Sequence, residues 1–215
     1  MEKVKLIANT PDAEETIVEI ARVSSKRSDK KSNYEGLINY LIKHKHWSPF
    51  EHASMTLEIN TSKAIGIQLI RHRSFTFQEF SQRYQDVNLL GDMFEDVELR
   101  KQADDNRQSS TEIFDPKIKM ESTQNASDAI KSLLGKTQSI YNKLIEAGVA
   151  RETARMILPL CTKTKIYMSG TLRSWIHFFE LRDDEHAQKE IQEIAKQGKE
   201  IFKKEFPVLS KALKY

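Results

Sequence analysis

A strand pattern that runs directly into a helix pattern constrains the fold of this chain more than any other feature. Apolar and polar residues alternate over 55–60, which is typical of a strand with one buried face. Thr61 or Ser62 can cap a helix predicted over 63–70, and this helix delivers the chain into Arg71. This succession predicts an α+β fold.

The remaining elements continue the mixture of strands and helices. A polar loop is expected over 24–33, and an irregular, mostly exposed connection over 85–124. No repeat and no linker interrupts residues 1–215, so we expect a single domain, with a small mostly antiparallel sheet packed by several helices and long C-terminal helices. The hydrophobic patterns predict strands over 4–8 and 163–168, and helices over 11–23, 37–46, 125–146, 151–158, 172–181 and 186–206.

Composition excludes several classes of protein. Lys plus Arg total 34 against 31 for Asp plus Glu, and a net charge of +3 over 215 residues does not indicate bulk binding of a nucleic-acid polymer. The single cysteine, Cys161, rules out an internal disulfide and fits a reducing compartment. No apolar run approaches the roughly 18 residues of a membrane span, and no signal-peptide pattern opens the chain. We therefore expect a cytoplasmic protein that does not bind membranes.

The stretch Arg71–Tyr84 carries the clearest functional signal. It packs three arginines, one histidine, one glutamate and four aromatic residues into fourteen positions, and its apolar residues do not fall on one helical stripe. Guanidinium groups bind phosphate or carboxylate in a bidentate way, and aromatic faces can stack on a planar ring. The alternative is a charged surface on which the arginines pair with Glu79 and nearby acids. The interleaving of aromatic residues favours a site for an anionic aromatic ligand such as a nucleotide.

Two further clusters contain arginines. Arg151 and Arg155 lie four residues apart and so share a helix face, and the apolar residues after Arg155 suggest a half-buried stem whose head needs an anion. Arg182 follows an apolar helix and precedes Asp183, Asp184 and Glu185, which by themselves could simply neutralise it.

Other candidate groups are weaker. Cys161 follows Leu-Pro-Leu, as a small core residue would, and Ser81 has no paired base, so neither is favoured as a nucleophile. The scattered glycines form no phosphate-binding loop. Four residues could suggest a metal site: His44, His46, Glu51 and His52. Their spacing matches no zinc pattern, so we expect them to have structural or ligand-contacting roles and to bind no metal.

The chain resembles the flavin-dependent thymidylate synthases. Their signature is Arg-His-Arg, two residues, Ser, one, Asn-Glu, one, Ser, one, Arg, and Arg71–Arg83 matches it except that Thr76 and Gln78 replace the first Ser and the Asn. Three supporting blocks occur in the family's order: Trp47–His52, Arg155–Leu160, and Leu181–Arg182 followed by His186–Gln188.

This resemblance implies an enzyme, a methyltransferase that converts dUMP to dTMP by reductive methylation in nucleotide biosynthesis. Methylenetetrahydrofolate would donate the carbon, FAD would carry the hydride, and NADPH would reduce the flavin. The resemblance also implies a homotetramer with active sites at subunit interfaces.

The resemblance further assigns residues. Arg182 would be catalytic, because it would stabilise negative charge on the uracil ring. FAD would contact Ser54, Arg71, His72, Arg73, Glu79, Thr171, Leu172, Arg173 and His177, with His52 near the folate and flavin rings. The dUMP pocket would comprise Gln68, Leu69, Ile70, Arg71, Glu79, Phe80, Ser81, Gln82, Arg83, Arg155 and Arg182. Thr171 and His177 stand where some relatives have asparagine.

A rival hypothesis is a non-catalytic nucleotide- or RNA-binding protein. In it, Arg71, Arg73 and the phenylalanines would form a stacking platform. Arg155 and Arg182 discriminate between the two, because remote arginines suit a mononucleotide pocket, whereas a strand-binding protein needs an extended basic groove.

Overall fold

The computed structural model describes residues 3–23, 34–120 and 122–215. The polar loop predicted over 24–33 lies outside the described residues. The chain forms two compact units, and a single domain over 1–215 stays a prediction. Unit 1 comprises residues 1–59, 70–78 and 167–215, and unit 2 comprises 60–69 and 79–166.

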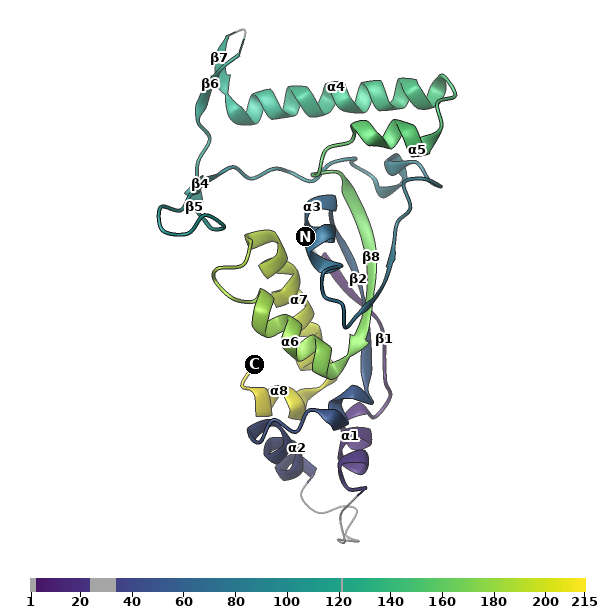
Figure 1. The fold of residues 1–215 in the computed structure, drawn as a ribbon, viewed down its shortest axis with the longest axis vertical. Coiled ribbons are helices and arrows are strands. Elements are labelled where there is room, and N and C mark those ends of the chain that lie inside the picture. Colours follow the sequence, from purple (N-terminus) through teal and green to yellow (C-terminus); the bar gives the residue numbers. More distant parts are fainter. Residues whose placement is uncertain (1–2, 24–33, 121) are drawn as a thin grey trace. The chain divides into compact units, whose positions relative to one another are not determined.

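The main sheet confirms the predicted strands and the α+β class. It has the strand order β1-β2-β8-β3, and β1 pairs with β2 in antiparallel fashion (Figure 1). Within this pair Val4 lies opposite Ile59, and Leu6 lies opposite Leu57. The apolar positions of β2 are buried, as their alternation predicted. The bounds are β1 Val4–Asn9, β2 Ser54–Ser62, β8 Lys163–Thr171 and β3 Thr76–Glu79.

Five α-helices and a 3₁₀ turn belong to the described part of unit 1. In Figure 1, α6 lies beside α7, α7 contacts β1, and α2 contacts α8. They are α1 Ala13–Ala21, α2 Tyr34–Lys43, η1 Ser48–Glu51, α6 Leu172–Arg182, α7 Lys189–Glu205 and α8 Pro207–Leu213.

The end of the chain differs from the prediction. We expected one helix over 186–206 that Pro207 would close, but α7 begins at Lys189 and Pro207 starts the separate helix α8. Proline has a fixed φ and no N–H, and both properties suit the first turn of a helix as well as a stop.

An aromatic core holds α6 in unit 1. Trp175, Phe178, Phe179 and Phe202 are at most 1% exposed. The Trp175 indole N–H donates a 2.9 Å hydrogen bond to the carbonyl oxygen of Met55 in β2. A buried indole needs such a partner, so this bond fixes the rotation of α6 against the strand.

Unit 2 is built around the long helix α4 (Figure 1). No helix in the described ranges is long and apolar enough to cross a membrane. The predicted helix over 151–158 ends early, because Arg155–Ile157 tightens into a 3₁₀ turn and Leu158 is extended before Pro159. The elements are α3 Lys63–Leu69, η2 Val87–Leu90, β4 Arg100–Gln102, β5 Ser110–Ile113, β6 Lys117–Lys119, β7 Thr123–Asn125, α4 Ala126–Glu146, α5 Arg151–Ala154 and η3 Arg155–Ile157.

The prediction of an irregular connection over 85–124 is partly wrong. It holds two antiparallel hairpins, β4–β5 and β6–β7, whose short and mostly polar strands gave no alternating signal. It also supplies core residues, because Val87 and Met93 are buried against Tyr141 and Ala154.

Replacing either of two glycines by alanine, one inside α4 and one just after it, should change stability in opposite directions. Gly135 lies inside the helix, and a Cβ added to it would stand in open space. Gly148 lies after the helix end and has a φ of +84°. We expect Gly135→Ala to raise the free energy of unfolding by about 0.5–1 kcal/mol. We expect Gly148→Ala to lower it by about 1–2 kcal/mol, because a Cβ is strained at that φ. Chemical denaturation of both variants checks the pair, and equal effects would contradict it.

Candidate functional site

The predicted site residues fall in both units. Unit 1 holds His52, Ser54, Ile70, Arg71, His72, Arg73, Thr171, Leu172, Arg173, His177 and Arg182. Unit 2 holds Gln68, Leu69, Glu79, Phe80, Ser81, Gln82, Arg83 and Arg155.

Unit 1 brings Arg182 and His72 together from positions 110 residues apart. The Arg182 Nε–H donates a 3.0 Å hydrogen bond to His72 Nε2. The His72 ring packs edge-on against Phe178, with a centroid distance of 5.0 Å. Since Nε2 accepts this bond, His72 carries its proton on Nδ1. Among the described residues the terminal guanidinium nitrogens have no partner, so they remain available to a ligand.

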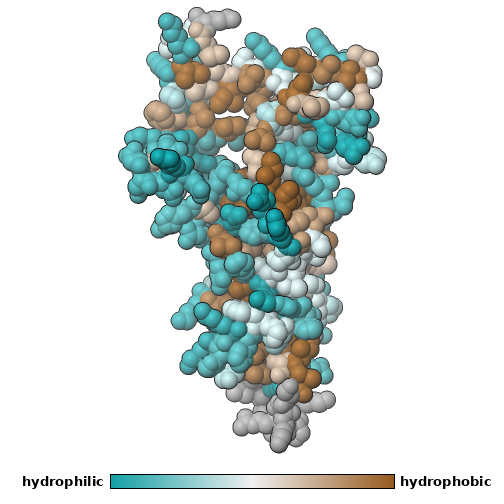
Figure 2. All heavy atoms as spheres, in the orientation of Figure 1, coloured by the Kyte–Doolittle hydropathy of each residue, from teal (hydrophilic) through white to brown (hydrophobic). Residues whose placement is uncertain are grey.

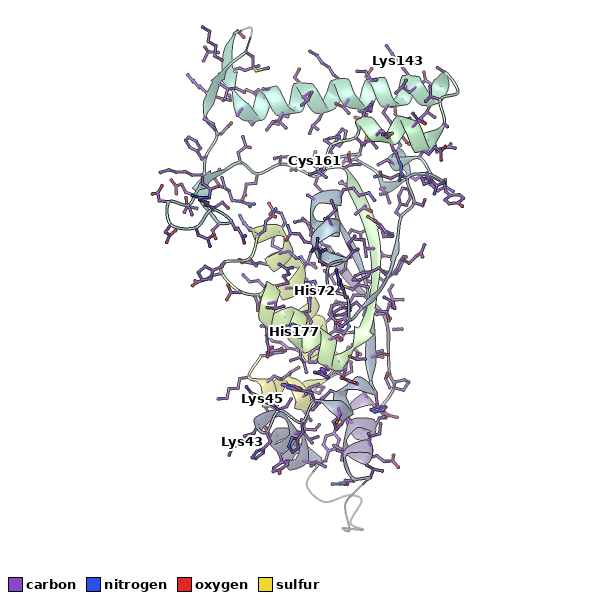
Figure 3. All side chains as sticks on the ribbon, viewed as in Figure 1. Lys43, Lys45, His72, Lys143, Cys161 and His177 are labelled. Carbon is purple, nitrogen blue, oxygen red and sulfur yellow. The ribbon has the colours of Figure 1, made fainter. Side chains whose placement is uncertain are left out.

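The surroundings keep His72 neutral. Burial, followed by the charge of Arg182 and the neighbouring His177, lowers the pKa of His72 to about 4 (Figure 3 labels both histidines). Burial also lowers the pKa of Arg182, although a guanidinium group stays charged in proteins. The pair therefore presents one positive charge, held in place by a neutral acceptor.

A pocket of about 380 Å³ opens in unit 1 along the polar face of α6. Arg173, His177 and Glu180 are exposed and lie at helical spacing, while the opposite face of α6 is buried. Arg173 forms an ion pair with Glu51 of η1, and both residues line this pocket. Trp47 of η1 adds an indole, so the pocket offers an aromatic ring together with one guanidinium, the carboxylates of Glu51 and Glu180, and hydrogen-bonding groups.

Several predicted flavin contacts in unit 1 also have structural roles. The Thr171 hydroxyl accepts a 3.3 Å hydrogen bond from the N–H of Ser174 and caps α6. Leu172 is fully buried, and its N–H donates to the carbonyl of Ala53. Ser54 bonds through both its N–H and its hydroxyl to Thr10 Oγ1.

Unit 2 brings two predicted dUMP-binding arginines to one residue, Glu152. Arg83 Nη2 lies 3.4 Å from Glu152 Oε2, and Arg155 Nε donates to the Glu152 carbonyl oxygen at 3.4 Å. The Arg83 and Glu152 side chains are 60% exposed, so their ion pair contributes little to stability. Arg155 is half-buried, as the sequence predicted. Both guanidinium groups can turn to an anion at little cost.

Glu79 is held by two partners in unit 2. Its Oε1 accepts 2.8 Å and 2.7 Å hydrogen bonds from Lys63 Nζ and Thr164 Oγ1, respectively. Both bonds fall on one oxygen, and among the described residues Oε2 has no partner. The second oxygen of a fixed, charged carboxylate thus remains an acceptor.

Gln82 has an unpaired buried amide. Its side chain is only 6% exposed, and Nε2 has no hydrogen-bond partner in the described structure. Such a donor usually finds an acceptor, so it is compatible with a bound ligand. Leu69, by contrast, is fully buried in the core, and only its backbone can line a pocket.

The expectation that Phe75 offers a stacking face is wrong. Phe75 is 7% exposed, and its ring centroid lies 4.8 Å from that of Trp175. A Cβ on Gly170 would come within 2.4 Å of the Phe75 ring, so only glycine allows this packing. Phe75 belongs to the core because α6 and β8 supply apolar partners that lie far away in the sequence.

Sequence reasoning assigned no individual role to several residues of these sites. Trp47 and Glu51 stood inside a matching block, but nothing in the sequence indicated that Glu51 would meet Arg173, 122 residues away. Lys63 and Thr164 gave no signal at all, because the carboxylate that they share, that of Glu79, lies 16 and 85 residues away in the sequence.

Comparison with known proteins identifies the family of this chain. Residues 5–208 match the family described as "Thymidylate synthase complementing protein". The chain belongs to this family. It is 47% identical over 202 residues to a probable flavin-dependent thymidylate synthase of Paramecium bursaria Chlorella virus 1, covering 94% of this chain and 90% of that protein.

Two further proteins are similar to this chain. A flavin-dependent thymidylate synthase of Synechocystis sp. is 44% identical over 195 residues, covering 91% of this chain and 86% of that protein. A similar crystal structure is that of the UMP/dUMP methylase PolB from Streptomyces cacaoi, bound with 5-Br dUMP. It has a TM-score of 0.74 and 28% identity, and the match covers 98% of this chain and 93% of that one.

The low pKa of His72 predicts a pH dependence of stability. The folded-state pKa of about 4 lies below the ordinary histidine pKa of 6.5, so the unfolded chain binds more protons between these values. The free energy of unfolding should therefore fall as pH decreases from about 6.5 to about 4. In His72→Gln, which keeps an acceptor for Arg182, Tm should decline less over this range than in the wild type. His44→Gln, which alters an exposed ring, is the control; identical slopes for the wild type and His72→Gln would refute the assignment.

Proposed function

We propose that this chain is a flavin-dependent thymidylate synthase that methylates dUMP reductively to dTMP. The co-substrates are 5,10-methylenetetrahydrofolate and NADPH, and the cofactor is FAD. The observation that carries the proposal is the Arg182 guanidinium, positioned by the neutral imidazole of His72. Family membership and the dUMP methylase fold support the reaction class.

Arg182 suits the activation of a uracil ring. Methylation at a ring carbon requires electron density to move through the ring, and a fixed cation stabilises the resulting negative charge without reorganisation. Because His72 is neutral, it positions this cation without competing for the anion or sharing its charge. No protein nucleophile is needed, which agrees with the half-buried Cys161, whose pKa is raised by burial.

The residues of unit 1 fit a flavin. Trp47 and His177 supply flat faces at the pocket, and Arg173 supplies a cation. Arg71 and Arg73 are exposed and can reach phosphate oxygens, and we assign them, with His72, Ser54, Thr171 and Leu172, to FAD. The flavin, when bound and reduced by NADPH, would supply the hydride that completes the methyl group. His52 at the end of η1 is assigned to the folate and flavin rings.

The residues of unit 2 fit a nucleotide monophosphate. Arg83 and Arg155 are assigned to the dUMP phosphate because both can turn from Glu152 to an anion. The unpaired Gln82 amide can donate to a phosphate or carbonyl oxygen, and the fixed carboxylate of Glu79 can accept from a ligand N–H or hydroxyl. The remaining unit 2 assignments are Gln68, Leu69, Phe80 and Ser81. Ile70 of unit 1 is also assigned to dUMP.

A homotetramer is part of the proposal. Leu133 and Ile140 of α4 are 61% and 52% exposed, and Figure 2 shows apolar side chains along this part of unit 2. A long helix with an uncovered apolar face suits packing against a second copy of the chain. A cytoplasmic location, where the folate and nicotinamide pools are reduced, belongs to the same proposal.

The rival function is a strand-binding protein with a phenylalanine platform. The burial of Phe75 removes the centre of that platform. The arginines that remain exposed are better explained by a small anionic ligand.

The deciding experiment is the conversion of dUMP to dTMP. Purified tetramer, loaded with FAD, should form dTMP only when methylenetetrahydrofolate and NADPH are both present. Each omission is a control, and the protein should show flavin absorption near ~450 nm. Protein that cannot be loaded with FAD, or that forms no dTMP, would disprove the function.

Arg182→Ala should lower kcat by about 10²-fold or more while FAD stays bound, because it removes charge stabilisation and not the flavin contacts. Steady-state rates and flavin content measure the two effects separately. Arg107→Ala, at an exposed hairpin arginine, is the matched control and should keep full activity. Undiminished turnover in Arg182→Ala would remove Arg182 from the chemistry.

A further inference from the structure

The turn that ends α2 carries a group of exposed basic and aromatic residues that the proposed function does not use. Tyr40 is 50% exposed, and its ring lies 4.3 Å from that of His44 and 5.7 Å from that of His46. Lys43 and Lys45 flank His44, and both are exposed (Figure 3). Neither lysine has a carboxylate partner among the described residues.

The backbone of this turn holds Lys45 in an unfavourable conformation. The N–H of Lys45 donates to the Ile42 carbonyl, and the N–H of His46 donates to the Leu41 carbonyl, which together form a Schellman motif. Lys45 occupies the left-handed position of this motif with φ +55°. Glycine is usual there, because a side chain at this φ is strained.

Helix-end electrostatics do not account for Lys45. Cations near a helix C-terminus are favoured by the helix dipole, and Lys43 in the last turn of α2 satisfies that preference. Lys45 lies beyond the helix, where glycine would make the same backbone bonds without strain. Lys214 at the end of α8 has a similar φ of +60°, so the strain at Lys45 matters here only together with its neighbouring cations and its nearness to the pocket.

The basic turn lies close in sequence to a residue that lines the pocket of unit 1. Lys45 is two residues before Trp47, which lines the pocket, so their Cα atoms are at most about 7 Å apart. Within unit 1 the acids that line the pocket have other partners, because Glu51 pairs with Arg173 and Glu180 Oε2 lies 3.9 Å from His177 Nδ1. Glu35 of α2 lies 3.7 Å from Lys211. Lys45 thus carries a positive charge close to a residue that lines a cavity for a planar ligand.

We propose that Lys43 and Lys45, with the imidazoles of His44 and His46, form an anion-binding subsite for the charged end of a co-substrate whose ring system enters this pocket. The inference rests on the proposed function, which supplies two sources of that chemistry. One is the γ-glutamyl carboxylates of a folate, and the other is the 2′-phosphate of NADPH. Both place negative charge at a distance from a planar ring.

The test compares KM values for matched ligands that differ only in charge. One arm uses methylenetetrahydrofolate with one or with several glutamates, and the other uses NADPH or NADH. In Lys45→Gly, KM for the more charged member of one pair should rise by about threefold or more, as expected for an exposed ion pair. KM for the less charged member and kcat should stay unchanged, and the wild-type preference should shrink at high salt.

Lys214→Gly is the matched control. Lys214 is also an exposed lysine in the left-handed region, with φ +60° at the end of α8, so it loses the same charge and strain. Both variants should keep or raise Tm, and only Lys45→Gly should change KM. Lys43→Ala should act in the same direction as Lys45→Gly without the gain in Tm.

The possible results of this test distinguish failure of the subsite from failure of the proposed function. A change confined to the glutamate arm or to the nicotinamide arm supports the subsite and identifies its ligand. Unchanged KM values in both arms, or equal changes in Lys214→Gly, overturn it while the proposed function stands. A wild-type protein that forms no dTMP with any co-substrate disproves the proposed function itself, and this inference falls with it.

Discussion

The packing of α6 against the sheet is the interaction on which the candidate site of unit 1 depends. The Trp175 indole is buried and bonded to the Met55 carbonyl, so the helix can adopt only one rotation. That rotation turns Arg173 and His177 outward to the pocket and leaves Arg182 at the end of the helix beside His72. A purely apolar contact would fix this angle less strictly, because it has no direction.

The chemistry then follows from how charge is distributed around that helix. His72 is kept neutral by burial and by the guanidinium beside it, so the pair holds one localised positive charge. In unit 2 the fixed charge is negative, because Lys63 and Thr164 hold the carboxylate of Glu79 through one of its oxygens. Preorganised charges of this kind act on a ligand without the cost of reorienting solvent.

Local patterns predicted those parts of the fold that depend on neighbouring residues. The alternation in β2, the apolar stripe of α4 and the glycine at its end are all confirmed. The hairpins between 100 and 125 and the start of α8 at Pro207 were missed. Short polar strands carry no periodic signal, and a proline can begin a helix as readily as end one.

The sequence by itself determined the fold class and the family, and it identified the arginine-rich residues that could bind a nucleotide. These conclusions rest on spacing along the chain, which the sequence contains in full. The tertiary structure alone decided which residues meet: Arg182 with His72, Arg173 with Glu51, and Phe75 with the core instead of a ligand. These contacts join positions 100 to 122 residues apart, and only the packed core, in which burial outweighs the loss of chain entropy, can specify them.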